Sequence, residues 1–189
     1  MTELAADKLV FIDESGFDTK MTRRSGRSAR GKPCIGAVPH GHWRNTTFIA
    51  GLRRDRIDAP MMIDGAMDGD AFRAWVEQSL APTLEAGNIV ICDNLNVHKN
   101  VGARAAIEAR GAELRFLPPY SPDLNPIEHL WDVLNKQVRS MEAPPRNLKD
   151  LKDLLLTSWC QTPQHTFRGL VESMPRRVRA VLTAKGRWS

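Results

Sequence analysis

The sequence predicts an α/β fold in which a mixed β-sheet is flanked by α-helices, followed by a C-terminal helical extension. Short apolar runs that suit strands dominate the first 63 residues, and from residue 68 strand and helix patterns alternate. After Pro144-Pro145 only helical patterns follow. The 189 residues suffice for one domain with an appendage. We therefore expect a main domain at residues 1–140 and the extension at residues 141–189.

The strands are predicted from short runs rich in β-branched and aromatic residues. Residues 8–13 fit a buried strand, because the run is too short for a helix and shows no alternation. Glycine-containing segments then separate further runs, which predicts an antiparallel meander. The other strands are expected near Cys34–Val38, Thr46–Leu52, Ala59–Ile63, Ile89–Asp93 and Leu114–Leu117.

The helices are predicted from apolar spacing and from end signals. Phe72, Trp75, Val76 and Leu80 share one helical face, so a helix should begin at Asp68 or Gly69 and reach Leu80. Residues 99–110 form an alanine-rich pattern that Gly111 ends. Further helices are expected at residues 126 to 138 or 139 after an Asn125 N-cap, at 148–159 after an Asn147 N-cap, and at 175–185.

The composition favours a basic intracellular protein with an anionic partner. The net charge is +5 and the pI is about 9.4; nucleic acid is the commonest partner of such a chain, although a merely basic soluble protein is the alternative. Cys34, Cys92 and Cys160 have no paired spacing, which indicates a reducing compartment. No secretory signal and no membrane-spanning run is found. We expect a cytoplasmic protein at the nucleoid, or a nuclear one in a eukaryotic host.

Three carboxylates stand at the ends of predicted core elements. Asp13 and Asp93 each end an apolar run, and Glu128 opens a helix 34 residues after Asp93. Hard cations such as Mg²⁺ take oxygen ligands, and two such ions can stabilise both the attacking and the leaving oxygen of an in-line displacement. The sequence therefore predicts a site for divalent metal and phosphate chemistry at Asp13, Asp93 and Glu128.

Each carboxylate also has an ordinary interpretation. Aspartate is a common turn residue after a strand, which could account for Asp13 and Asp93. Asn125 and Glu128 fit a capping box, which would stabilise the helix without any catalysis. Glu14 competes with Asp13, but adjacent strand residues point to opposite faces, so we choose Asp13. His98 follows Asp93 by five residues and could assist near the metals.

Residues 20–32 form a basic segment with glycine and serine spacers. Such a segment is either a solvated loop or a loop that contacts phosphates, and we expect phosphate contact without sequence readout. The cations concerned are Lys20, Arg23, Arg24, Arg27, Arg30 and Lys32.

Three segments resemble the catalytic signature of DDE transposases of the mariner superfamily. They are FIDESGF at 11–17, CDNLNVHK at 92–99 and the distinctive LPPYSPDLNPIEHLW at 117–131. Residues 30–118 look most like the bacterial insertion-sequence branch, and residues 120–189 look more like animal mariner-type elements. The resemblance covers nearly the whole chain.

This resemblance implies a ribonuclease H-like fold with Asp13, Asp93 and Glu128 as catalytic and metal-binding residues. It also implies two Mg²⁺ or Mn²⁺ ions, cleavage at transposon ends, strand transfer, and integration at a short target sequence. We expect double-stranded DNA as the partner and a homodimer on DNA. Family members carry an N-terminal helix-turn-helix region that is absent here, so a separate helix-turn-helix subunit is a further expected partner.

Two rival functions remain open at this point. One is a catalytically inactive transposase remnant that binds DNA or a transposase partner. The other is a stand-alone ribonuclease H-like nuclease. The presence of all three carboxylates favours an active enzyme.

Overall fold

The computed structural model describes residues 5–22, 26–36, 44–141 and 144–184, and within them a five-stranded sheet. Its order is β3-β2-β1-β4-β5. β1 pairs antiparallel with β2 and β2 with β3, whereas β4 lies parallel to β1 and β5 parallel to β4, which confirms the mixed sheet. The bounds are β1 (Leu9–Asp18), β2 (Asn45–Leu52), β3 (Ile57–Asp64), β4 (Ile89–Cys92) and β5 (Glu113–Phe116).

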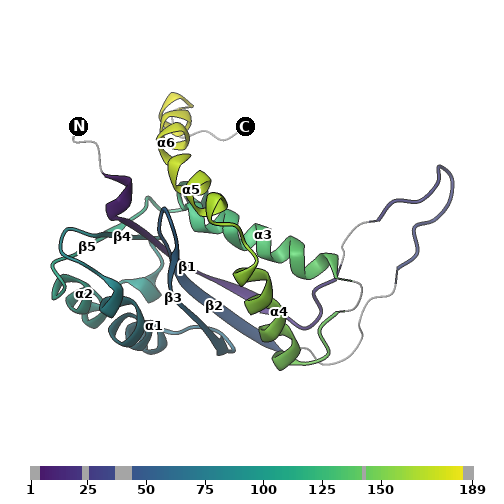
Figure 1. Ribbon diagram of the computed structural model, residues 1–189, viewed down its shortest axis with the longest axis horizontal. Coiled ribbons are helices and arrows are strands. Elements are labelled where there is room, and N and C mark those ends of the chain that lie inside the picture. Colours follow the sequence, from purple (N-terminus) through teal and green to yellow (C-terminus); the bar gives the residue numbers. More distant parts are fainter. Residues whose placement is uncertain (1–4, 23–25, 37–43, 142–143, 185–189) are drawn as a thin grey trace.

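Helices cover both faces of this sheet. α1 and α2 lie on one face, and α3 and α4 lie on the other, with α5 and α6 continuing beyond α4 (Figure 1). The bounds are α1 (Gly69–Trp75), α2 (Val101–Glu108), α3 (Pro126–Ser140), α4 (Leu148–Cys160), α5 (Gln164–Glu172) and α6 (Met174–Thr183). Within the described ranges, no helix has the length and apolar character needed to cross a membrane.

The central strand β1 supplies side chains to two cores. Leu9 and Phe11 belong to the core under α3, α4 and α5, whereas Val10 and Ile12 belong to the core under α1 and α2. This alternation follows from the period of two along a strand. It continues into the next two residues and sets the sides on which Asp13 and Glu14 lie.

The helix ends follow local chemistry. The Asn100 side chain accepts hydrogen bonds from the backbone N–H groups of Gly102 and Ala103, so α2 begins two residues later than predicted. Gly111, with φ of 71°, follows α2 in the left-handed conformation that glycine tolerates. Asn147 caps α4 as predicted, through a hydrogen bond from the Asp150 N–H. The predicted helix from residue 69 to Leu80 is α1 extended by a π-helical turn, Val76–Leu80.

Two parts of the chain differ from the prediction. Residues 34–36 form no strand, and both Cys34 and Ile35 are exposed, so burial against the sheet does not stabilise them; residues 37 and 38 lie outside the described residues. The helix α5 was not predicted. Its Pro163 N-cap makes no side-chain hydrogen bond, and burial of Phe167 and Val171 in the shared core stabilises it instead.

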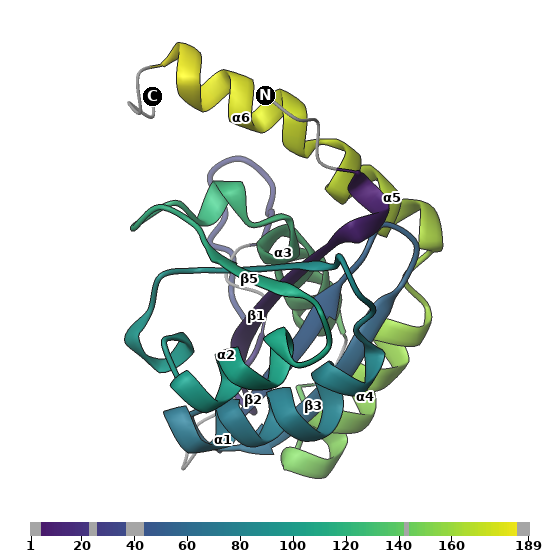
Figure 2. The same cartoon turned by 90° about the vertical axis from the view of Figure 1, so that its left-hand side faces the viewer.

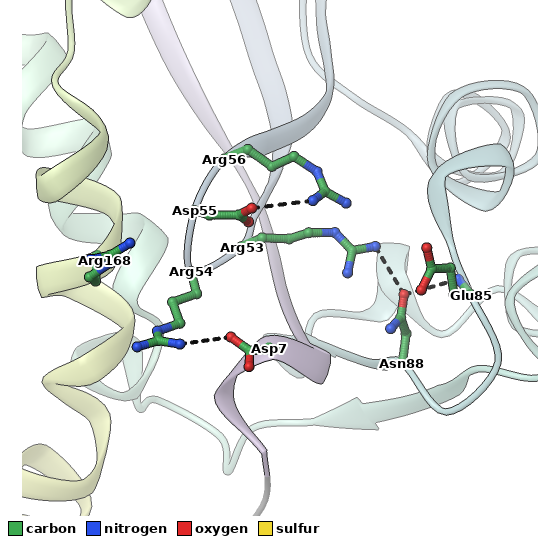
Figure 3. Close-up of a pocket in the computed structure, with 8 residues that line it drawn as sticks. All are labelled: Asp7, Arg53, Arg54, Asp55, Arg56, Glu85, Asn88 and Arg168. Atoms are coloured by element: carbon green, nitrogen blue, oxygen red, sulfur yellow. Dashed lines mark hydrogen bonds and ion pairs between the residues drawn. The ribbon is translucent and has the colours of Figure 1, made fainter.

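An arginine-rich cavity of about 350 Å³ lies at the end of the sheet where β1 and β4 begin. Figure 3 shows Asp7, Asn88 and the turn between β2 and β3 around it. The buried Arg53 pairs with Asp58 and donates from Nη2 to the Thr83 carbonyl at 3.1 Å and to Asn88 Oδ1 at 3.0 Å. Its neighbour Arg54 pairs with Asp7 and Glu172 at the surface. Arg53 thus ties the turn to the start of β4, and Arg54 ties it to Asp7 and to α5.

We predict that Arg53→Met lowers the free energy of unfolding by about 1–3 kcal/mol, because it leaves the buried Asp58 carboxylate with only the exposed Arg56 as its partner. Urea unfolding measures this loss. The matched control is Arg54→Met, which removes two exposed ion pairs at the next position and should have a much smaller effect. Equal losses in the two variants would contradict the role given to Arg53.

Candidate active site

The strand register brings Asp13 and Asp93 to the same level of the sheet. Leu9 pairs with Ile89 and Phe11 with Ile91 across the parallel strands β1 and β4. The same offset places Asp13 beside Asp93, which directly follows β4. Ligands gather beyond the carboxyl ends of strands in such sheets.

Asp13 is a buried carboxylate under α3. Asp13 is only 6% exposed, and its Oδ2 accepts a hydrogen bond from Trp131 Nε1 at 3.1 Å. Burial raises the pKa of Asp13 well above its usual value, and the nearby charges of Glu128, Glu14 and Asp93 raise it further. The indole hydrogen bond opposes this shift only in part. Asp13 therefore lies among other acids in a desolvated position.

Asp93 shares a buried histidine with Glu14. His98 Nδ1 contacts Asp93 Oδ1, His98 Nε2 lies 2.9 Å from Glu14 Oε2, and the ring stacks against Phe72 of α1 with centroids 4.6 Å apart. Glu14 therefore lies on the α1 side of β1 and Asp13 on the α3 side, as alternation predicts. The histidine joins the carboxylate after β4 to the one on β1.

The protonation of His98 depends on the two carboxylates that it contacts, Asp93 and Glu14. Burial lowers the pKa of His98, but the hydrogen bonds with Asp93 and Glu14 outweigh it and raise the pKa to about 10. Burial also raises the pKa of Asp93, yet bonds from His98 and from the Leu95 N–H lower it overall. At neutral pH the histidine is therefore a cation between two carboxylates.

Glu128 lies in the first turn of α3 and does not form the capping box that was its alternative interpretation. Asn125 occupies the N-cap position, but its Nδ2 donates to the Ile12 carbonyl at 3.3 Å, and its N–H bonds to Pro122. The half-buried Glu128 carboxylate makes no hydrogen bond with the described residues. Burial raises the pKa of Glu128, as do Asp132 and Asp93.

Asp93 and Glu128 line one cavity of about 290 Å³. Asn125 lines it as well, and its Oδ1 is buried without a hydrogen-bond partner among the described residues. The exposed side chains of Leu95 and Tyr120 form part of the wall. The cavity thus combines carboxylates, an unsatisfied amide oxygen and an apolar edge.

The donor set fits a hard divalent cation by its chemistry. Carboxylate and amide oxygens are the ligands that Mg²⁺ and Mn²⁺ accept, and the mutual repulsion of the acids would be relieved by a cation. In this conformation, no three histidine, cysteine, aspartate or glutamate side chains of the described ranges are arranged to hold a metal ion. Asp13 is turned to Trp131 and Asp93 to His98.

A family profile described as "DDE superfamily endonuclease" matches residues 8–152. The match covers more than half of the chain and includes Asp13, Asp93 and Glu128. The chain belongs to this family.

Curated relatives are transposases of nematodes. The chain is 31% identical over 150 residues to the Tcb1 transposase of Caenorhabditis briggsae, covering 77% of this chain and 54% of that one. It is 33% identical over 114 residues to the Tc1 transposase of Caenorhabditis elegans, covering 60% and 40%. The chain thus spans about half the length of these relatives, and similarity to animal elements is not confined to residues 120–189.

Solved structures of the Mos1 mariner transposase have the same fold as this chain. The Mos1 strand transfer complex has a TM-score of 0.81 at 16% identity and covers 97% of this chain and 56% of that one. The Mos1 paired end complex with Mg has a TM-score of 0.81 at 15% identity, covering 97% and 57%. These matches confirm the ribonuclease H-like fold with its C-terminal helices.

The predicted basic loop is described in part. Arg23 and Arg24 lie outside the described residues; Lys20 follows β1, and Arg27, Arg30 and Lys32 are exposed. Residues 26–36 project from the body beyond the end of α3 (Figure 1). The loop leaves the sheet from the end of β1 that follows Asp13, but the phosphate contacts predicted for it stay a prediction.

Sequence reasoning missed the partners that hold the carboxylates. Trp131 and Asn125 were treated as a helix-face residue and an N-cap, although both bond to β1. His98 was expected to assist near the metals, but its contacts with Asp93 and Glu14 were not predicted. A signal exists in each case, because all three lie in the two motifs that contain Asp93 and Glu128.

We predict that Asp13→Asn raises the melting temperature of the metal-free protein. The pKa of Asp13 is higher in the folded chain than in the unfolded one, so the fold favours the protonated form and loses stability as pH rises through the folded pKa. Asparagine removes this cost and still accepts the Trp131 hydrogen bond.

Calorimetry from pH 4 to pH 9 with a chelator tests this, since the gain should grow with pH. Asp153→Asn removes an exposed carboxylate from α4 and is the control, with an expected change near zero. A metal-free Asp13→Asn protein that melts below the wild type at high pH would refute the assigned cost.

Proposed function

We propose that this chain is the catalytic domain of a DDE transposase that cleaves and joins DNA strands. Asp13, Asp93 and Glu128 would hold two Mg²⁺ or Mn²⁺ ions. The observation that carries this proposal is the meeting of three mutually repelling carboxylates at one edge of a ribonuclease H-like sheet, in a chain of the DDE family.

When bound, the ions would supply the positive charge that in-line phosphoryl transfer needs at the attacking and leaving oxygens. The protein groups do the positioning. Trp131 fixes the Asp13 carboxylate from the α3 side, and His98 fixes Asp93 from the α1 side. Phosphoryl transfer depends mainly on positioning and charge stabilisation, so no covalent nucleophile is required.

Glu128 contributes a carboxylate that has no competing protein partner among the described residues. Its place in the first turn of α3 holds it near the positive end of the helix dipole, which favours its charged form. Asn125 joins the start of that helix to the Ile12 carbonyl, one residue before Asp13. Asn125 would therefore hold Asp13 and Glu128 at a fixed position relative to each other.

The proposed partner is double-stranded DNA, at transposon ends and at a target. The similar Mos1 structures include paired-end and strand transfer complexes, and complexes with Mg and with Mn. As the resemblance to mariner-type transposases implies, we extend the proposal to a homodimer on DNA and to a separate helix-turn-helix subunit that recognises the ends.

We predict that Glu128→Gln abolishes metal-dependent nicking of transposon-end or pre-nicked duplexes, by at least about 100-fold. The change removes a charge and keeps the shape, so the metal-free melting temperature should stay unchanged or rise slightly, given the raised pKa of Glu128. Gel assays with Mg²⁺, and again with Mn²⁺, measure the nicking. Glu108→Gln on α2 is the control and should retain activity.

Intact nicking in Glu128→Gln would sink the catalytic role of this residue. A wild type that stays inactive with both metals, even with the end-binding region supplied in trans, would favour an inactive remnant. A preference for RNA–DNA hybrids over DNA ends would favour a ribonuclease.

We also predict that the basic loop contacts phosphates without reading sequence. Replacing the arginines with alanine should weaken binding to all duplexes alike and flatten the salt dependence by about 0.9 for each phosphate that the loop no longer binds. Anisotropy titrations with two unrelated duplexes measure this, and a loss confined to one sequence would contradict it. The replaced residues are Arg23, Arg24, Arg27 and Arg30.

A further inference from the structure

The helix α6 is basic and contains no acidic residue of its own. Arg176, Arg177 and Arg179 lie within four positions of one another. None of the three forms an ion pair within the part of the chain that the structure describes. The arginines of the turn between β2 and β3, by contrast, are all paired with acids.

The helix has a packed face and a free face. Met174, Arg177 and Val181 follow helical spacing and are buried or half-buried. Arg176 and Arg179, three positions apart, are exposed on another face. The Arg179 guanidinium bonds only to the Pro175 carbonyl of its own helix among the described residues. The free face therefore offers two neighbouring guanidinium groups to solvent.

The packed face fixes α6 beside the candidate active site. Arg177 Nη1 donates to the Asp123 carbonyl at 3.2 Å, and Nε donates to Ser173 Oγ at 2.8 Å. Asp123 belongs to the turn that leads into Asn125 and the first turn of α3, where Glu128 lies. Figure 2 shows α6 extending from the body past the segment between β5 and α3.

Neighbouring arginines of α6 repel one another. Burial lowers the pKa of Arg177, and repulsion from Arg176 lowers it further. An anion that approached α6 would relieve this repulsion.

We propose that the free face of α6, through Arg176 and Arg179, binds backbone phosphates of duplex DNA that flank the strand held at Asp13, Asp93 and Glu128. This inference rests on the proposed function, because it takes duplex DNA as the substrate. Guanidinium groups match the geometry of phosphate oxygens.

The charge pattern favours DNA over a lipid surface. Membrane-surface helices pair a basic face with a wide apolar face that carries aromatic residues. Met174–Thr183 has no aromatic residue, and Val178 and Leu182 are its exposed large apolar side chains. That apolar area is small for membrane insertion, whereas two adjacent arginines suffice for two phosphates.

The test compares two double variants of the whole 189-residue chain. Arg176→Gln with Arg179→Gln removes the free face of α6. Arg110→Gln with Arg168→Gln removes the same charge from exposed arginines, one just before β5 and one at the cavity where β1 and β4 begin. Anisotropy with a labelled duplex of arbitrary sequence, in chelator, gives Kd across salt concentrations from about 50 to 200 mM.

We expect the slope of log Kd against log salt to be shallower by about 1.8 in the α6 variant, or 0.9 for each phosphate. Across that fourfold range the wild type then loses about 12-fold more affinity than the α6 variant. The control variant should keep the wild-type slope, and both should keep the wild-type melting temperature because all four side chains are exposed.

Equal slopes in the wild type and the α6 variant would overturn the inference, as would equal losses in the two variants. Nicking by the wild type and not by Glu128→Gln would then leave the proposed function standing. A wild type that binds no duplex would overturn both. Loss of binding to phosphatidylserine vesicles in the α6 variant, with unchanged DNA binding, would assign the helix to membranes and also overturn the inference.

Discussion

Repulsion among carboxylates at one edge of the sheet is the constraint on which the site depends. The parallel register of β1 and β4 places Asp13 level with Asp93, and Glu14 and Glu128 add further charge. Desolvation makes this arrangement costlier for Asp13. The fold tolerates it because the four residues before Asp13 are buried in two cores, each large apolar side chain contributing about 1.5–3 kcal/mol.

Each carboxylate is restrained by a different layer of the molecule. Trp131 reaches Asp13 from α3, and His98 reaches Asp93 while stacking on Phe72 of α1. Both helical layers therefore contribute to one site, and the sheet between them sets the spacing. Trp131 and His98 therefore link the helical layers on the two faces of the sheet through the carboxylates that they orient.

Local patterns predicted the elements better than the contacts between them. The ends of two apolar runs located Asp13 and Asp93, but only Asp93 directly follows its strand. Asp13 lies inside β1, which continues to Asp18 because it stays paired with β2 beyond the predicted end at residue 13. The capping box at Asn125 was wrong because its amide bonds to Ile12, 113 positions earlier, and no local pattern contains that contact. The strand predicted at residues 34–38 was wrong in residues 34–36, where Cys34 and Ile35 are exposed and gain no burial against the sheet. The α5 helix was missed because tertiary burial, rather than an end signal, stabilises it.

The arrangement of charged residues differs between the two ends of the sheet. Where β1 and β4 begin, Arg53, Arg54 and Arg56 are neutralised by acids, which strengthens the fold. Beyond the other end, the acids of the site repel one another, and the arginines of α6 have no acidic partner among the described residues. If stability alone were selected, these opposite charges would be paired, as they are around Asp58. Kept apart, the acids can be satisfied by cations and the arginines by phosphates, so one nucleic acid substrate with its metal ions would complement both at once.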